Sequence, residues 1–247
     1  MEIRNYLDST FLKLPAETGL ADDLHDDLVR QTVLEAIDEN FAAVVVRPDQ
    51  VVMANKLVDK VASTVAVCTV IGFPKGTDSI SDKLSEAKKA IENGADELDF
   101  VVNYQAFING NHDLIREEIY NGTLLCRSNN RVIKWIIETA ALDISQIAQL
   151  SALIKNVILT EFQEDDYASV FVKSSTGYYK TSDGSPSGAT PEAVITMLEN
   201  AAPLPVKASG GIKTYDDALQ YINLGVKRLG TSAAKIIAYG GTSNESY

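Results

Sequence analysis

The stretch Ser169-Val-Phe-Val-Lys-Ser-Ser-Thr-Gly177 contains both a predicted strand and a residue of unusual chemistry. Its apolar run, residues 170–172, is typical of a buried strand, and Lys173 lies at the carboxyl end of that run. Gly177 then predicts a loop. Because burying an unpaired ammonium group is costly, Lys173 must pair with an acid, extend to water or lose its proton. A salt-bridged lysine at a strand end and a reactive amine both fit this stretch.

Similar apolar runs occur along the whole chain and alternate with segments of helical periodicity. The predicted strands lie at residues 6–10, 41–46, 65–71, 97–102, 132–138, 170–174, 205–209 and 226–231. The predicted helices lie at residues 21–40, 50–60, 79–92, 113–128, 144–159, 191–200, 214–223 and 233–239. Eight strands alternating with eight helices in 247 residues predict an α/β protein with a (β/α)8 TIM-barrel fold. A doubly wound open sheet is the alternative.

The composition is that of one folded core. Apolar residues make up 45% of the chain and charged residues 23%, which is the usual balance of a globular protein. No linker or low-complexity tract interrupts the alternation of strands and helices. We therefore expect a single domain over residues 1–239 and a flexible C-terminal tail over residues 240–247.

The net charge and the cysteine content limit the kinds of partner that the protein can have. A net charge of −12 argues against binding to nucleic acid or to an anionic membrane surface, although local amides and lysines can still bind a small anion. Cys68 and Cys126 form neither a metal-binding motif nor a disulfide framework. Residues 1–15 lack the pattern of a signal peptide, and no apolar run reaches the ~18 residues of a membrane-spanning helix. We expect a cytoplasmic protein that acts on a small molecule.

Polar residues within the predicted strands identify a candidate site. In a barrel both faces of each strand are covered, so both should be largely apolar. In the fourth strand Leu98 and Phe100 share the outward face, which turns Asp99 into the barrel near its carboxyl end. The same alternation turns three lysines inward, namely Lys134, Lys173 and Lys207. A buried ion-pair cluster with a purely structural role is the alternative to an active site, but unpaired charges there would cost several kcal/mol each.

Two lysines on neighbouring strands and one aspartate suit Schiff-base chemistry. To attack a carbonyl near neutral pH, Lys173 must be uncharged, whereas a free lysine titrates at about 10.4. Burial and the charge of Lys207 on the next strand would both lower the pKa of Lys173. Asp99 can pair with Lys207 and take part in proton transfer.

Glycines follow the last two predicted strands, where barrel enzymes commonly bind phosphate. Gly210 and Gly211 follow the seventh strand, and Gly230 with Ser232 ends the eighth. Because glycine has no side chain, a phosphate group can come close to the backbone amides there and accept hydrogen bonds from them. We expect a phosphate group to bind at these residues.

These residues resemble the deoxyribose-phosphate aldolase family, which comprises class I aldolases with a (β/α)8 fold. The resemblance extends from Tyr6 to about Ile237 and includes several long motifs in the same order. The motifs are Val67-Cys-Thr-Val-Ile-Gly-Phe-Pro74, Asn93-Gly-Ala-Asp-Glu-Leu-Asp99, Lys134-Trp-Ile-Ile-Glu-Thr139, Phe171-Val-Lys-Ser-Ser-Thr-Gly177 and Val206-Lys-Ala-Ser-Gly-Gly-Ile212.

The resemblance implies both an activity and roles for particular residues. It implies reversible cleavage of 2-deoxy-D-ribose 5-phosphate to D-glyceraldehyde 3-phosphate and acetaldehyde, without a metal or cofactor, by a homodimer or homotetramer. It further implies that Lys173 forms the Schiff base and that Asp99 and Lys207 transfer protons. The substrate-binding residues that it implies are Asp8, Thr10, Lys134, Thr176 and Gly177, together with Gly210, Gly211, Gly230 and Ser232.

Three other functions are compatible with parts of this pattern. A metal-dependent aldolase would need a cluster of imidazole and carboxylate ligands, and the only histidines, His25 and His112, lie in predicted helices. A class I aldolase acting on a different sugar phosphate would keep Lys173 and change the phosphate loops. A non-catalytic barrel that binds sugar phosphates would have no use for a lysine of lowered pKa.

Overall fold

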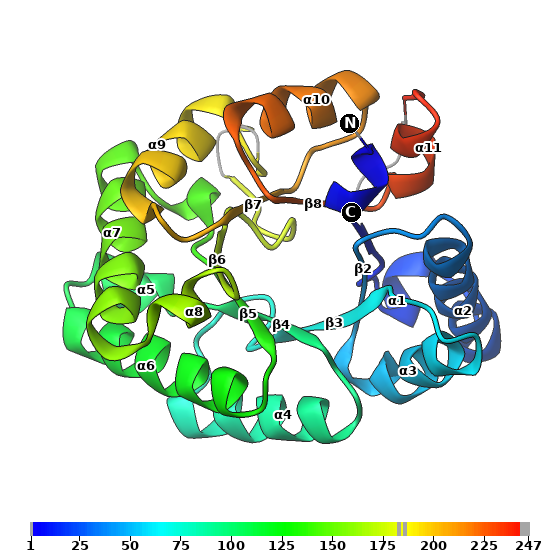
Figure 1. The fold of residues 1–247 in the computed structure, drawn as a ribbon, viewed down its shortest axis with the longest axis horizontal. Coiled ribbons are helices and arrows are strands. Elements are labelled where there is room, and N and C mark those ends of the chain that lie inside the picture. Colours follow the sequence, from blue (N-terminus) through cyan, green and yellow to red (C-terminus); the bar gives the residue numbers. More distant parts are fainter. Residues whose placement is uncertain (1, 182–183, 185–186, 243–247) are drawn as a thin grey trace.

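Eight parallel strands close into a barrel surrounded by helices in the computed structural model of the chain (Figure 1). The structure describes residues 2–181, 184 and 187–242. Because β1 pairs in parallel with both β2 and β8, the sheet has no edge, which excludes the open sheet and confirms the (β/α)8 prediction. The strands are β1 (Leu7–Thr10), β2 (Ala43–Val46), β3 (Ala66–Ile71), β4 (Glu97–Val101), β5 (Val132–Ile136), β6 (Val170–Lys173), β7 (Val206–Ser209) and β8 (Arg228–Thr231).

The helices that were predicted from periodicity form the outer ring. They are α2 (Asp22–Asp38), α3 (Val51–Lys60), α4 (Ile80–Glu92), α6 (His112–Ser128), α7 (Ile144–Glu161), α9 (Pro191–Ala201), α10 (Tyr215–Leu224) and α11 (Ala234–Ala238). Several begin at a side-chain cap. The hydroxyl of Thr190 accepts a hydrogen bond from the Ala193 amide at the start of α9, and that of Thr214 accepts one from Asp217 at the start of α10.

Short helical turns in the loops were not predicted. They are α1 (Pro15–Thr18), α5 (Tyr104–Ile108) and α8 (Glu164–Tyr167), and the 3-10 turns η1 (Ile3–Tyr6), η2 (Pro48–Gln50) and η3 (Thr139–Ala141). Each has at most five residues, which is too short for a 3.6-residue period to be recognised in the sequence.

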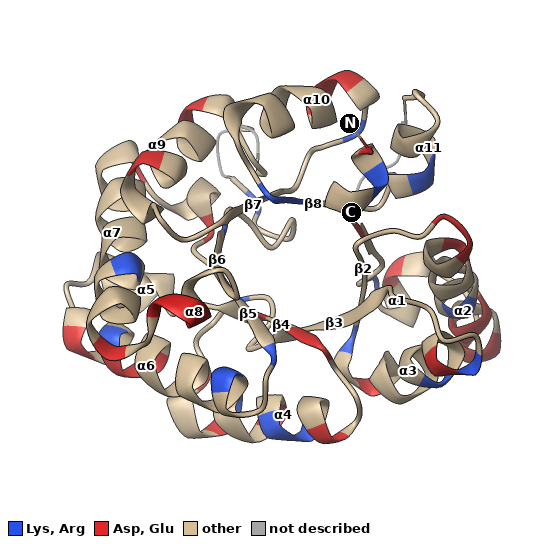
Figure 2. Cartoon of the chain, in the orientation of Figure 1, with Lys and Arg blue, Asp and Glu red and all other residues tan. Residues whose placement is uncertain are grey.

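Most of the hydrophobic core lies between the outward faces of the strands and the helices. Leu98, Phe100 and Trp135 belong to this layer, and the ring centroids of Phe100 and Trp135 are 5.1 Å apart. Trp135 also donates a 3.1 Å hydrogen bond to Thr123 of α6. The barrel interior holds only small apolar groups of residues in addition to charged ones. Charged residues therefore lie in two places, on the outer helices and on the strands of the barrel (Figure 2).

The end of the described chain packs against the barrel. Thr242, within the segment expected to be a tail, forms a bridge with Thr214, and the Tyr215 amide donates to the Gly241 carbonyl at 3.2 Å. Residues 243–247 of the expected tail lie outside the described residues. Within the described part of the chain, no helix has the length and apolar character needed to cross a membrane.

Candidate active site

Lys173 is the last residue of β6 and points into the barrel beside Lys207 of β7. The two residues are register partners on adjacent strands. The Lys173 amine donates to Oδ2 of Asp99 at 2.7 Å, and the Lys207 amine donates to the same oxygen at 2.9 Å. Lys173 is 4% exposed, whereas Lys207 and Asp99 are completely buried. The alternation of β4, β6 and β7 therefore brings these three predicted residues together.

Asp99 is held by donors on both of its oxygens. Its Oδ1 accepts from Lys134 at 2.8 Å and from the Cys68 thiol at 3.2 Å. Burial alone would raise the pKa of Asp99, but the charges of the three lysines outweigh burial and hold it well below its usual value. Asp99 is thus a fixed negative charge. Its low pKa makes it a weak proton acceptor on its own.

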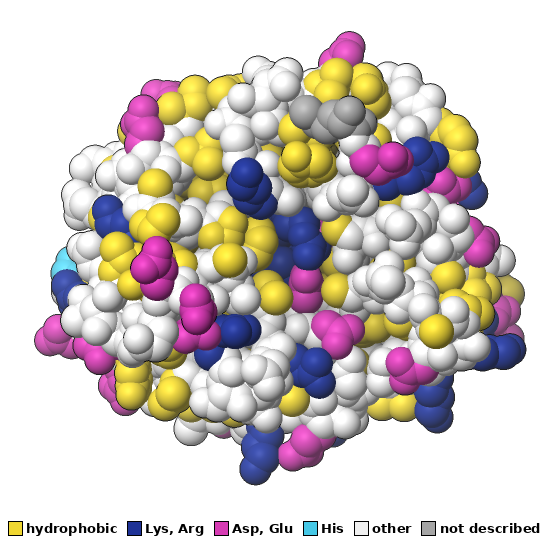
Figure 3. Space-filling view, in the orientation of Figure 1, with side chains coloured by type: hydrophobic (Ala, Val, Ile, Leu, Met, Phe, Trp, Pro, Cys, Tyr) yellow, Lys and Arg dark blue, Asp and Glu magenta, His cyan; other side chains and the backbone are white. Residues whose placement is uncertain are grey.

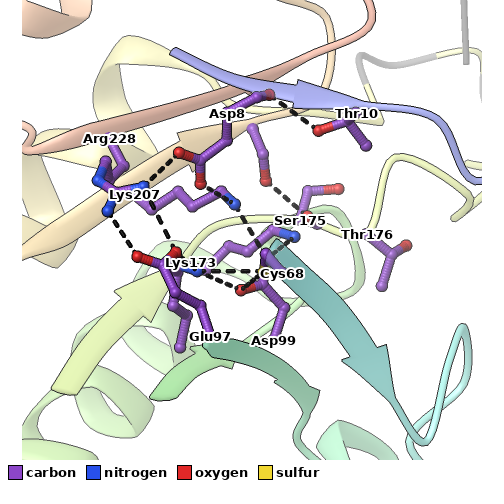
Figure 4. A network of polar contacts seen from close by, with 12 residues as sticks. Asp8, Thr10, Cys68, Glu97, Asp99, Lys173, Ser175, Thr176, Lys207 and Arg228 are labelled. Atoms are coloured by element: carbon purple, nitrogen blue, oxygen red, sulfur yellow. Dashed lines mark hydrogen bonds and ion pairs between the residues drawn. The ribbon is translucent and has the colours of Figure 1, made fainter. Parts of the chain in front are cut away.

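A second set of ion pairs lies towards the amino ends of the strands (Figure 4). Asp8 pairs with Lys207 at 2.6 Å and with Arg228 at 2.5 Å. Glu97 pairs with Arg228 and with Lys134, each at 2.6 Å. Together with the pairs of Asp99, these ion pairs form a continuous buried network that joins six strands of the barrel. Basic and acidic side chains fill the hollow at the centre of the molecule seen down the barrel (Figure 3). We call this set the interior network: Asp8, Glu97, Asp99, Lys134, Lys173, Lys207 and Arg228.

The lysines of the interior network differ in their tendency to hold a proton. Burial and the neighbouring charge of Lys207 lower the pKa of Lys173, against the attraction of Asp99. For Lys207, burial is outweighed by Asp8 and Asp99, which raise its pKa. Burial is likewise outweighed for Lys134, whose pKa is raised by the negative charges of Asp99 and Glu97. Lys173 is therefore the amine that is most readily uncharged, and an uncharged amine can attack a carbonyl group.

The loop after β6 is fastened to a buried carboxylate. Glu138 is 1% exposed and has a left-handed backbone with φ of 55°, which aims its side chain at this loop. Its Oε1 accepts from the Ser175 hydroxyl at 2.8 Å, and its Oε2 accepts from the Thr176 amide at 3.2 Å and from the Thr176 hydroxyl. Burial raises the pKa of Glu138 despite these bonds. Thr176, predicted to bind substrate, is thus held by Glu138.

A cavity of about 420 Å³ lies at the carboxyl ends of β6, β7 and β8. Four of the predicted substrate-binding residues line it: Gly177, Gly210, Gly211 and Ser232. Gly210 and Gly211 have φ of 86° and 78°, a conformation that favours glycine and leaves the backbone open to a ligand. Lys180 and Lys213 also line the cavity. Amides, a hydroxyl and two lysines together can bind an anion such as phosphate.

A second cavity of about 710 Å³ adjoins the first and shares Glu17, Tyr178 and Ser232 with it. Thr10 lines this second cavity, although its hydroxyl donates to the Asp8 carbonyl at 3.0 Å. Tyr178 packs edge-on against Phe73 with ring centroids 5.1 Å apart. The Arg47 guanidinium lies 5.0 Å from the centre of the Phe73 ring. Tyr178, which lines both cavities, is therefore held in place by Phe73 behind it.

Three predicted substrate-binding residues lie below these cavities. Asp8 and Lys134 are completely buried in the interior network and line neither cavity. Gly230 provides space, because a Cβ atom there would lie 3.1 Å from Cε of Lys207 and 2.9 Å from Cβ of Ser209. The contacts of these residues are thus with Asp99, Lys207 and other interior side chains rather than with open space.

Arg228 was not among the predicted site residues, although it lies within the predicted eighth strand, residues 226–231. The alternation of β8 contains the missing signal. Leu229 packs in the outer core, which turns Arg228 and Gly230 inward. Within the described residues, no group of three or more His, Cys, Asp or Glu side chains is arranged to hold a metal ion.

Comparisons with known proteins agree with this geometry. The family model described as DeoC/LacD family aldolase matches residues 14–231. The deoxyribose-phosphate aldolase of Caldicellulosiruptor saccharolyticus is 37% identical over 238 residues, which cover 96% of this chain and 96% of that protein. That of Streptococcus gordonii is 36% identical over 248 residues and the full length of both. The tetrameric deoxyribose phosphate aldolase of Aeropyrum pernix superposes with a TM-score of 0.78 at 29% identity, covering 96% of this chain and 89% of that one.

Proposed function

The chain belongs to the DeoC/LacD family of aldolases, and we propose that it cleaves 2-deoxy-D-ribose 5-phosphate reversibly through a Schiff base on Lys173. The products are D-glyceraldehyde 3-phosphate and acetaldehyde. The observation that carries this assignment is the position of the Lys173 and Lys207 amines on one oxygen of Asp99. Such a pair lets one amine stay uncharged while the other remains an acid.

In the first half of the reaction, Lys173 forms the Schiff base. The uncharged amine attacks C1 of the open-chain sugar to give a carbinolamine. Lys207, which is charged in the resting enzyme, donates a proton to the departing hydroxyl, so that water leaves and an iminium forms. Lys207 is then an uncharged amine next to Asp99.

In the second half, the carbon–carbon bond breaks and the enzyme is restored. Lys207 takes the proton of the 3-hydroxyl, directly or through a water molecule, as the bond between C2 and C3 breaks. The bonding electrons flow into the iminium, which becomes an enamine, and C3 becomes the aldehyde of D-glyceraldehyde 3-phosphate. Lys207 protonates the enamine carbon, and water then hydrolyses the iminium to release acetaldehyde and return a proton to Lys207.

Asp99 supports each of these steps without leaving its charged state. It pairs with the Lys207 ammonium and orients the Lys173 amine through the same oxygen. The 5-phosphate fits the cavity lined by Gly177, Gly210, Gly211 and Ser232, where Lys180 and Lys213 supply positive charge. Every step uses these side chains and water.

The proposal extends to assembly and compartment. The Aeropyrum pernix relative is described as tetrameric, and a homodimer or homotetramer is the assembly we assign to this chain. Both cysteines are free and buried, which suits the reducing cytoplasm. Residues 1–239 would form the single catalytic domain.

Borohydride trapping tests the role of Lys173. Incubation of the protein with acetaldehyde and borohydride should give a stable adduct that peptide mapping locates at Lys173. Lys173→Leu should lose the adduct and lower cleavage of 2-deoxy-D-ribose 5-phosphate by on the order of 10⁴-fold or more, since the nucleophile is gone. Circular dichroism should show that the variant remains folded. An adduct at a different lysine, or full activity in folded Lys173→Leu, would disprove the assignment.

A further inference from the structure

Arg228 lies at the first residue of β8, at the opposite end of that strand from the predicted phosphate loop. Its guanidinium donates to Oδ1 of Asp8 at 2.5 Å and to Oε1 of Glu97 at 2.6 Å. Its side chain is 16% exposed, and it lines neither of the two cavities described above. The activity proposed above gives this residue no part in binding or chemistry.

The interior network contains unequal numbers of acidic and basic side chains. Its carboxylates are Asp8, Glu97 and Asp99, and all three pair only with members of the network. Its bases are one arginine and three lysines. When Arg228, Lys134 and Lys207 are charged, three positive charges face three negative ones. Within the network, the remaining base, Lys173, then has no carboxylate left to balance a charge of its own, which favours its neutral form.

We propose that Arg228 is a positioning residue that keeps the reactive amine of Lys173 uncharged by balancing the carboxylates beneath it. The proposal rests on the proposed function, because it takes Lys173 to be the nucleophile. Arg228 acts through two ion pairs. It satisfies Asp8 and Glu97, so that Lys207 and Lys134 remain available to Asp99 and no further positive charge is needed there.

The other groups around Lys173 act on it independently of Arg228. The Cys68 thiol is uncharged, because burial raises its pKa. Glu138 lies beside Lys173 and attracts its charge, but its oxygens accept from Ser175 and Thr176 and form no ion pair with the interior network, so its attraction is the same with and without Arg228. The charged and titratable groups that face Lys173 come from four strands: Cys68 from β3, Asp99 from β4, Lys134 from β5 with Glu138 just after it, and Lys207 from β7. Asp8, Glu97 and Arg228 are one ion pair further away. Strand β2 contributes only the apolar Ala43 and Val45 to the interior.

Loss of the Arg228 charge should move a proton onto Lys173. In Arg228→Met, three carboxylates would face only Lys134 and Lys207, and the excess negative charge would raise the pKa of Lys173. Arg228→Lys keeps a positive charge near the same carboxylates. Arg228→Met/Glu97→Gln removes one charge of each sign and restores the balance. Glu97→Gln alone leaves an excess positive charge and should lower the pKa of Lys173 further.

The experiment measures how the rate of reductive trapping of acetaldehyde on Lys173 depends on pH in the full-length protein. Each variant is compared with the unaltered protein at every pH, so that the pH dependence of the reductant cancels. In Arg228→Met the midpoint of the pH profile of the trapping rate should shift upward by about one pH unit or more. At pH values below that midpoint, the trapping rate should then fall about tenfold. Arg228→Lys and Arg228→Met/Glu97→Gln should shift it much less, and Glu97→Gln should shift it downward.

The outcomes separate this inference from the function on which it rests. Absence of an adduct at Lys173 in the unaltered protein would overturn the proposed function. A normal adduct with an unshifted midpoint in folded Arg228→Met would overturn the role of Arg228 and leave the function standing. A shift that Arg228→Met/Glu97→Gln fails to reverse would also overturn it, because lost packing rather than charge would be the cause. Should Arg228→Met fail to fold, an unshifted Glu97→Gln variant would overturn the inference equally.

Discussion

Lys173 and Lys207 show how the pKa values of two identical side chains on adjacent strands can be shifted in opposite directions. Lys207 has two carboxylate partners, Asp8 at 2.6 Å and Asp99 at 2.9 Å, and is completely buried. Lys173 has one, Asp99, whose oxygen it shares with Lys207. Both amines lose solvation on burial, but only Lys207 gains enough attraction to offset that loss. The number of acidic partners therefore decides which lysine loses its proton more readily and which keeps it, in agreement with the proposed roles of nucleophile and acid.

Lys213 provides a test of phosphate binding at the scale of one residue. It is partly buried and lines the cavity beside Gly210 and Gly211. Lys213→Met should remove about 1 kcal/mol of attraction and raise KM for 2-deoxy-D-ribose 5-phosphate roughly fivefold, with kcat little changed. Steady-state kinetics with unphosphorylated 2-deoxy-D-ribose should show no such rise. Lys235→Met, at a lysine outside the cavity, is the matched control. An equal effect on both sugars would contradict a phosphate contact.

At the scale of elements, α4 and α6 are joined behind the active site by a second buried ion pair. Lys83 of α4 is 1% exposed, and its amine donates to Glu118 of α6 and, at 2.8 Å, to the Val101 carbonyl at the end of β4. The Asn103 amide donates to the other oxygen of Glu118 at 3.0 Å. This pair therefore connects two helices to the strand that bears Asp99.

Breaking this pair should be costly, whereas replacing it should not. Glu118→Gln leaves a buried ammonium group without its counter-ion and should lower the free energy of unfolding by about 3 kcal/mol in urea titrations. Lys83→Met/Glu118→Leu should recover most of that loss. Glu35→Gln, at the exposed pair of Glu35 with Lys235, should cost less than about 1 kcal/mol and is the control. A small effect of Glu118→Gln would mean that water already reaches the pair.

The eight strands and the main helices were predictable because each is long enough to show its period, and because buried parallel strands are strongly apolar. The same alternation placed Asp99, Lys173 and Lys207 in one interior. It could not show how their charges are shared, since a lysine on β7 and an aspartate on β1 are far apart in sequence. The left-handed backbone of Glu138 was equally hidden, because it depends on tertiary contacts with Ser175 and Thr176. The alternation of residues along a strand thus predicts on which face of the strand a side chain lies. Which residues that side chain contacts depends on the fold.

At the scale of the whole molecule, the charge near the candidate site differs from that of the protein as a whole. The net charge is −12, yet the acids of the interior network are matched by bases, and two lysines, Lys180 and Lys213, line the predicted phosphate site against one carboxylate, Glu17. The acidic residues lie mostly on the outer helices (Figure 2). Nearby charges in a low-dielectric interior interact strongly with a bound anion, whereas distant surface charges are screened by water and salt. An anionic substrate can therefore bind to a strongly acidic protein.

The lowered pKa of Lys173 should also be visible in the stability of the folded protein. Above that lowered pKa the folded state lacks the proton on Lys173, whereas the unfolded chain keeps it up to about pH 10.4. The unfolded state then binds more protons, so this residue makes the free energy of unfolding rise with pH, by at most about 1.4 kcal/mol per pH unit. Relative to Lys173→Met, which has no titrating group there, the unaltered protein should gain stability as the pH rises from that lowered pKa to about pH 10.

Urea denaturation of both proteins across this range measures the difference directly and needs no substrate. The subtraction of Lys173→Met removes the contributions of groups whose titration is the same in the two proteins. Lys207 and Lys134 act in the opposite sense, because their pKa values are raised in the folded state. Their contribution to stability is fully present below the pKa of a free lysine and is lost as the pH rises above that pKa. A difference that stays flat up to about pH 10 would mean that Lys173 is charged in the folded protein, as in an ordinary salt bridge. The amine would then have to lose its proton only when substrate binds, and the interior charge balance would not be what activates it.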